Sequence, residues 1–178
     1  MGTLGTGQPF GSIVQTAYVV ADIESEMEAY VDRLGVGPWY LADHFRPPNP
    51  RYRGKVVAPL FSLAVAYSGA TMIELIQQHD DLPSVFKEQV AQRGYGFHHW
   101  GVGVEDFDAS VAHYLKQGYE IAFSDTAPMG MRVAYMDTMK DLPGMVELIE
   151  ANDAYEGFFT PVYKASLGWD GRDPIRRA

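Results

Sequence analysis

Four polar side chains stand inside runs of apolar residues, at positions where a strand would bury them: Gln15, Glu74, His99 and Glu147. Their neighbours in these runs are mainly valine, isoleucine, leucine, alanine and methionine. A carboxylate in such a strand is energetically costly unless a counter-charge or a metal ion compensates its charge. Two carboxylates, one imidazole and one amide in such surroundings predict that the four side chains converge on one site.

An internal repeat relates these positions to each other. Residues 15–22 and 99–106 are both short apolar runs that end in an aspartate, and residues 72–76 resemble residues 145–149. Each aspartate is followed by apolar residues at helical spacing and then by a glycine, which is typical of a capped amphipathic helix. The repeat places the amide equivalent to the imidazole and one carboxylate equivalent to the other.

Each half of the chain is therefore expected to fold as β-α-β-β-β. The predicted fold class is α+β, with two tandem β-α-β-β-β modules that form a cleft. We expect the modules at residues 12–79 and 97–150, joined by a linker at 80–96 with a short helix, Pro83–Arg93, that has proline in its first turn. The aromatic-rich tail 151–178 is expected to dock on the body. The strands expected after the two helices are 38–45, 56–67 and 71–77 in the first half and 119–123, 131–137 and 144–150 in the second.

Two adjacent histidines compete for the place in the site. The repeat alignment favours His99, and strand alternation then puts His98 on the opposite, helix-facing side. His44, His79 and His113 fall in loop or helix contexts and are interpreted as surface residues.

Composition excludes several classes of protein. The 178 residues include no cysteine, so disulfides, thiol nucleophiles and cysteine-ligated metals are absent. The formal net charge of −9 disfavours nucleic acid as a partner. No apolar run approaches the roughly 20 residues of a membrane span, and the first residues lack the pattern of a secretory signal. A cytoplasmic protein that does not bind membranes is expected.

The repeated units and their motifs resemble the vicinal oxygen chelate superfamily, which includes glyoxalase I, methylmalonyl-CoA epimerase, extradiol dioxygenases and bleomycin-resistance proteins. The motifs are residues 13–22, 71–76, 97–106 and 145–149, and the run FHHWGVGVED is most similar to the epimerase-like branch. The resemblance implies a metal site on the first and last strand of each module, and a homodimer is one arrangement that it implies. Carried over residue by residue, the implied ligands are Gln15, Glu74, His99 and Glu147.

A site of this composition suits one divalent ion such as Zn²⁺, Ni²⁺, Co²⁺ or Mn²⁺. Two vicinal oxygens of a substrate could chelate such an ion, which acts as a Lewis acid on an enediolate-like intermediate. A nearby carboxylate would remove the proton, with Glu147 as first choice and Glu74 as second. This chemistry predicts an isomerase, epimerase or lyase. Ring-cleaving dioxygenases need a second histidine where this chain has Gln15, which disfavours that alternative.

An apolar, partly aromatic pocket for a small-molecule substrate is expected around the site as a group, although core packing is the favoured explanation for each member taken singly. A basic cluster in an otherwise acidic chain (Arg46, Arg51, Arg53 and Lys55) could bind the phosphates of coenzyme A or form a solvated loop. A ligand-sequestering protein of the bleomycin-resistance type is the non-enzymatic alternative. The expected pocket residues are Trp39, Tyr40, Phe61, Met129, Met131 and Tyr135.

Overall fold

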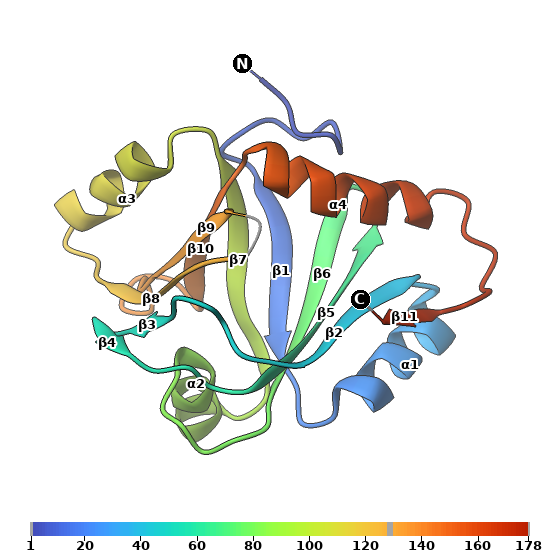
Figure 1. Cartoon of the computed structure of the whole chain (residues 1–178), viewed down its shortest axis with the longest axis horizontal. Coiled ribbons are helices and arrows are strands. Elements are labelled where there is room, and N and C mark those ends of the chain that lie inside the picture. Colours follow the sequence, from blue (N-terminus) through green and yellow to red (C-terminus); the bar gives the residue numbers. More distant parts are fainter. Residues whose placement is uncertain (1, 128–129, 178) are drawn as a thin grey trace.

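The protein folds around one curled sheet of eleven strands, seen in a computed structural model that describes residues 2–127 and 130–177 (Figure 1). The strand order is β11-β2-β5-β6-β1-β7-β10-β9-β8-β3-β4. In this order, four neighbouring strands from β2 to β1 come from the first module, and the next four, from β7 to β8, come from the second. The modules meet edge to edge where β1 runs antiparallel to β7. The predicted α+β fold with two β-α-β-β-β modules is therefore confirmed.

The first module begins with a strand and a helix that match the expected pattern. Asp22 accepts a hydrogen bond from the amide of Ser25 and so caps α1, and Gly35 ends that helix in the left-handed conformation with φ of 63°. The elements of this module are β1 (Ile13–Val19), α1 (Ile23–Leu34), β2 (Trp39–Phe45), β3 (Arg51–Tyr52), β4 (Lys55–Val56), β5 (Phe61–Ser68) and β6 (Thr71–Gln78).

The second module repeats this arrangement. Asp106 caps its helix through the amide of Ala109, at the position equivalent to Asp22. The elements are β7 (Gly96–Val104), α3 (Phe107–Lys116), β8 (Ile121–Thr126), β9 (Arg132–Met136) and β10 (Met145–Glu150).

Two of the expected elements differ in the structure: the strand 56–67 and the start of the linker helix. The expected strand 56–67 is divided between β4 and β5, because Pro59 lies between them and has no N–H for a strand ladder. The linker helix α2 is Val85–Arg93 and does not include Pro83. Ser84 caps it by accepting from the amide of Lys87, so Pro83 precedes the cap.

The β3–β4 hairpin links the two halves of the sheet. It belongs to the first module in sequence, yet β3 pairs with β8 of the second module. This pairing extends the sheet beyond β8 and, with β2 near the opposite edge, contributes to its curl (Figure 1).

Helices cover both faces of the curled sheet. On the outer face, α1 packs over one module and α3 over the other. On the inner face, α2 covers one end, and α4 (Asp153–Ser166) from the tail covers the other (Figure 1). Tyr155, Phe159 and Val162 of α4 are buried there, and β11 (Ile175–Arg177) adds to the edge of the sheet beside β2.

Packing of α1 on the outer face gives a direct test of this arrangement. Met27 has no exposed surface, whereas Leu34 on the same helix is 66% exposed. We expect Met27→Ala to lower the free energy of unfolding by about 2–5 kcal/mol, because it leaves a cavity beneath the helix. Leu34→Ala is the matched control and should change it by less than about 0.5 kcal/mol. Equal effects of the two variants in chemical denaturation would contradict the placement of α1.

Candidate metal centre

The four polar residues lie on the inner face of the sheet, on the four central strands. Two rows of paired residues place them there. Ala17 on β1 pairs with Glu74 on β6 and with His99 on β7. In the adjacent row, Gly101 on β7 pairs with Gln15 on β1 and with Glu147 on β10. The repeat thus brings residues from both modules together across the junction of the sheet.

Glu74, His99 and Glu147 form a compact, buried cluster. The Nε2 atom of His99 lies 3.4 Å from Oε2 of Glu74 and 3.2 Å from Oε2 of Glu147. His99 is fully buried, and the two glutamates are 6% and 5% exposed. One donor atom from each residue lies within 4.8 Å of the others. This spacing allows the three side chains to hold one ion.

Gln15 completes the set through a close approach to Gly101. A Cβ atom at position 101 would lie 2.7 Å from both Cβ and Oε1 of Gln15 and 3.0 Å from Cδ1 of Ile149. Any larger residue there would displace the Gln15 side chain, since real Cβ atoms do not approach so closely. Gly101 thus leaves room for the amide of Gln15.

The electrostatics of the cluster follow from its burial. Burial raises the pKa of the Glu74 carboxyl, and the charge of Glu147 adds to this, against the opposing effects of the nearby His99 imidazole and Gln15 amide. Burial lowers the pKa of His99, but the nearby carboxylates of Glu147 and Glu74 outweigh it and raise the pKa from 6.5 to about 9. A proton on His99 therefore partly balances the two carboxylates when no metal is bound.

The cluster also fits a metal ion. Oε2 of Glu74 and Nε2 of His99 are buried and have no hydrogen-bond partner in the part of the chain described. Buried polar atoms normally have such a partner, so these two atoms face a position that another group would fill. One imidazole nitrogen, two carboxylates and one amide oxygen are the ligands of a borderline or hard divalent ion.

His98 lies on the same face of the sheet as His99, contrary to the prediction that it lies on the opposite face. Strand β7 contains a bulge: His99 pairs with Ala17, but the next residue of β1, Tyr18, pairs with Phe97. His98 is the extra residue, and a bulge allows two successive side chains to point the same way. Burial lowers the pKa of His98, as does the charge of His99, so its imidazole is neutral. The pair of adjacent histidines in an otherwise largely apolar strand was the one signal of this irregularity in the sequence.

Tyr135 is the expected pocket residue that contacts the cluster. It pairs with Glu147 across β9 and β10, and its ring centroid lies 4.7 Å from that of His99. Burial raises the pKa of Tyr135 well above its ordinary value, and the charges of Glu147 and Glu74 raise it further. Its phenol therefore stays protonated and can donate a hydrogen bond.

The other expected pocket residues occupy different parts of the core, as far as the structure describes them. Trp39 is wrong as a pocket residue: it is buried on the outer face, where its ring packs edge-on against Tyr30 of α1 at 5.6 Å. The reason is strand alternation, since the neighbouring Tyr40 has the inner-face orientation and pairs with Val65. Among the remaining predicted pocket residues, Phe61 packs in the core beside α2 and Met131 borders the core beneath α4. Met129 lies outside the described residues.

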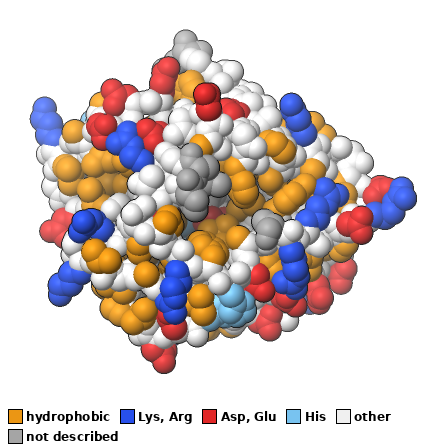
Figure 2. All heavy atoms as spheres, in the orientation of Figure 1, with side chains coloured by type: hydrophobic (Ala, Val, Ile, Leu, Met, Phe, Trp, Pro, Cys, Tyr) orange, Lys and Arg blue, Asp and Glu red, His pale blue; other side chains and the backbone are white. Residues whose placement is uncertain are grey.

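A second group of potential ligands lies near the surface, at the ends of β2 and β6. Asp43, His44 and His79 have donor atoms within 4.8 Å, and the two imidazoles stack at 4.0 Å. Asp43 also pairs with Arg177 at 3.2 Å. Figure 2 shows histidine side chains at the lower edge of the drawn face, beside acidic side chains. His44 is exposed, in agreement with the prediction that it is a surface residue, whereas His79 is half-buried.

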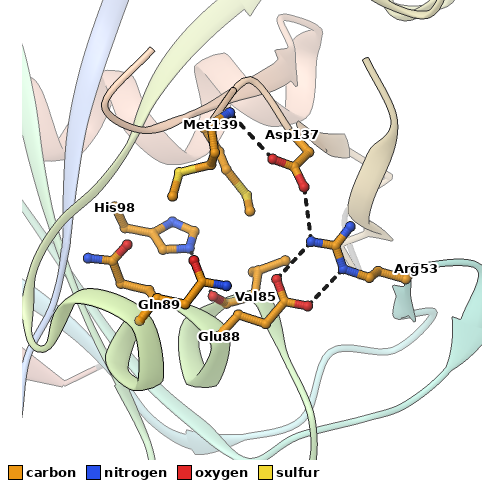
Figure 3. A pocket seen from close by; sticks show the side chains of 9 residues that line it. Arg53, Val85, Glu88, Gln89, His98, Asp137 and Met139 are labelled. Atoms are coloured by element: carbon orange, nitrogen blue, oxygen red, sulfur yellow. Dashed lines mark hydrogen bonds and ion pairs between the residues drawn. The ribbon is translucent and has the colours of Figure 1, made fainter. Parts of the chain in front are cut away.

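Basic residues around the β3–β4 hairpin are engaged within the protein. Arg53 forms ion pairs with Glu88 of α2 at 2.7 Å and with Asp137 at 2.9 Å, and Arg46 pairs with Asp80 at 2.9 Å. Arg53 and His98 both line a cavity of about 60 Å³ that α2 borders (Figure 3). Two of the four basic residues thus have carboxylate partners already.

No helix in the described part of the chain has the length and apolar character needed to cross a membrane.

Solved structures share this fold at low sequence identity. A hypothetical protein from Bacillus halodurans C-125 is 19% identical with a TM-score of 0.60, covering 80% of this chain and 95% of its own. Methylmalonyl-CoA epimerase from Mycobacterium tuberculosis is 20% identical with a TM-score of 0.60, covering 85% and 98%. A methylmalonyl-CoA epimerase in complex with methylmalonyl-CoA and NH₄⁺ is 17% identical with a TM-score of 0.58, covering 82% and 98%.

Sequence comparison gives the family. No curated protein sequence matches the chain. Residues 14–135 match the family model described as "Glyoxalase/Bleomycin resistance protein/Dioxygenase superfamily". This match covers more than half of the chain, including both repeats of the first strand and helix. The protein therefore belongs to the glyoxalase/bleomycin resistance protein/dioxygenase superfamily, also called the vicinal oxygen chelate superfamily.

Proposed function

We propose that this protein is a metal-dependent isomerase, epimerase or lyase that acts on a small substrate with two adjacent oxygens. One observation carries the proposal: Glu74, His99 and Glu147 are buried together, with Nε2 of His99 and Oε2 of Glu74 lacking hydrogen-bond partners. Membership of the superfamily and the fold shared with methylmalonyl-CoA epimerases support the same kind of reaction.

The proposed ligands are Gln15, Glu74, His99 and Glu147. A divalent ion held by them would supply Lewis acidity that makes the proton next to a substrate carbonyl easier to remove. The two carboxylates match the charge of such an ion, so the assembled centre is neutral. The surrounding apolar core excludes water and strengthens each electrostatic interaction in the site.

The chain's own residues would move the proton. Glu147 is the proposed base that accepts it from the carbon next to the carbonyl, and Glu74 is the alternative, because both carboxylates border the same position. Return of the proton to the opposite face of the same carbon gives epimerisation, and return to the neighbouring carbon gives isomerisation. The phenol of Tyr135, beside Glu147, stays protonated and can donate a hydrogen bond to a substrate oxygen.

Metal binding tests the ligand set first. We expect protein loaded with Zn²⁺ or Co²⁺ and then dialysed to retain about one ion per chain at the buried centre, measured by elemental analysis. His99→Ala removes the only nitrogen donor of the set and should lower the affinity sharply. His113→Ala, an exposed histidine on α3, is the matched control. Retention of the ion in His99→Ala and in the control alike would contradict the site.

Proton release gives a second test. Because the pKa of His99 is raised to about 9, the metal-free protein holds a proton there at pH 7, and an incoming ion must displace it. The apparent affinity for Zn²⁺ should therefore increase with pH up to about 9 and then level off. Calorimetry in buffers of different ionisation enthalpy measures the released protons. A binding enthalpy that is the same in all buffers at pH 7 would show that no proton is displaced.

Exchange of substrate protons with D₂O tests the base. Co²⁺-loaded protein would be incubated with 2-hydroxy ketones and with coenzyme A thioesters, and exchange at the α-carbon followed by NMR. Glu147→Gln keeps an oxygen donor but removes the proton acceptor, so exchange should fall by about 10²–10⁴-fold while metal is retained. Glu74→Gln is the matched variant and should have the smaller effect. The opposite order would assign the base to Glu74.

If the metal-loaded protein binds one of these compounds but does not exchange its α-proton, the result would favour the ligand-sequestering function instead. The buried carboxylates disfavour that alternative, since a site that only sequesters an apolar ligand gains nothing from their desolvation.

A further inference from the structure

His98 touches the imidazole of His99 on the side away from the carboxylates. The bulge in β7 places both rings on the inner face, and Nδ1 of His98 lies 2.8 Å from Nδ1 of His99. The other nitrogen of His98, Nε2, lies 3.3 Å from the carbonyl oxygen of Val85, the first residue of α2. Both nitrogens of His98 thus have a partner, and both residues are buried.

The partners fix which nitrogen of each ring carries hydrogen. The carbonyl oxygen of Val85 can only accept, so Nε2 of His98 is the donor in that bond. No carboxylate in the described part of the chain lies within ion-pair distance of His98, and a buried imidazolium without such a partner is unfavourable. A neutral ring that carries its hydrogen on Nε2 has its lone pair on Nδ1. His98 is therefore the acceptor for the Nδ1–H of His99.

We propose that His98 is a positioning residue that keeps the hydrogen of His99 on Nδ1 and thereby presents Nε2 of His99 as the metal-binding nitrogen. The metal part of this inference rests on the proposed function. Nε2 is the atom that lies 3.4 Å and 3.2 Å from the two glutamates. Were the hydrogen of a neutral His99 on Nε2 instead, the ring could not donate its lone pair to an ion between those carboxylates.

Helix α2 holds His98 in place for this role. The ring of Phe86 on α2 lies 4.9 Å from that of His98, and the same helix supplies the carbonyl oxygen that accepts from it. Arg53 ties Glu88 of α2 to Asp137 after β9, on the far side of the small cavity beside His98 (Figure 3). His98 thus connects the linker helix α2 to His99 of the candidate metal centre.

Two variants of His98 separate its hydrogen bonding from its packing. His98→Gln keeps an amide oxygen that can accept from His99 and an amide N–H that can donate to Val85. His98→Phe keeps an aromatic ring of similar size but can do neither. Their unfolding midpoints identify any general loss of folding before binding is compared.

Nitrogen-15 NMR of histidine-labelled protein reads the hydrogen positions directly. In metal-free wild-type protein we expect hydrogen on Nε2 of His98, hydrogen on Nδ1 of His99, and a coupling between the two Nδ1 atoms through the hydrogen bond. After addition of Zn²⁺, His99 should keep hydrogen on Nδ1 and coordinate through Nε2. His98→Phe should bind Zn²⁺ about 10–100-fold more weakly, and His98→Gln should restore most of the affinity.

The outcomes distinguish this inference from the proposed function. Hydrogen on Nδ1 of neutral His98, or wild-type affinity for Zn²⁺ in a folded His98→Phe variant, would overturn the positioning role. If wild-type protein binds no Zn²⁺, the proposed function and the metal part of the inference both fail. The hydrogen positions in the metal-free protein then show by themselves whether His98 accepts from His99.

Discussion

Two carboxylates buried beside one imidazole set the central constraint on this structure. Glu74 and Glu147 are almost completely buried on the inner face of the sheet, among mainly apolar side chains. Their mutual repulsion and their desolvation both oppose ionisation, so the fold must supply positive charge at that position. A proton on His99 provides part of it, and a divalent ion would provide all of it. Ala17 and Gly101 are small and leave space for such a centre, and the amide of Gln15 offers it a further ligand.

The repeated module is what delivers the charges to one place. Each module puts one polar residue on its first strand and one on its last, and these strands are neighbours within the module. When the two first strands pair antiparallel, the four positions become contiguous across the junction. The inner helices, one from the linker and one from the tail, then close the two ends of the curled sheet. A binding centre between modules is thus a consequence of repeat geometry rather than of any local motif.

Much of this could be predicted from residue patterns. The helix caps at Asp22 and Asp106 are local signals that depend on neighbouring residues alone, and the structure contains both. The convergence of four polar residues could also be inferred, because alternation in strands and equivalence in the repeat constrain it strongly.

Features that depend on distant pairing could not be predicted in this way. The pairing of β3 with β8 joins segments far apart in the chain. The bulge that turns His98 inward changes the register by one residue inside an apolar run. Trp39 and Tyr40 show the same limit, because composition alone does not tell which of two adjacent aromatic residues lies on the inner face of the sheet.

The location of a bound ion tests the proposed metal centre most directly. Crystals of the protein soaked in Co²⁺ would be measured at the cobalt absorption edge, where anomalous scattering marks the ion without reference to any assumed ligand. We expect a strong peak bordered by Nε2 of His99 and by the carboxylates of Glu74 and Glu147, with the amide oxygen of Gln15 nearby. A peak found only at the Asp43, His44 and His79 group, with none at the buried cluster, would contradict this expectation.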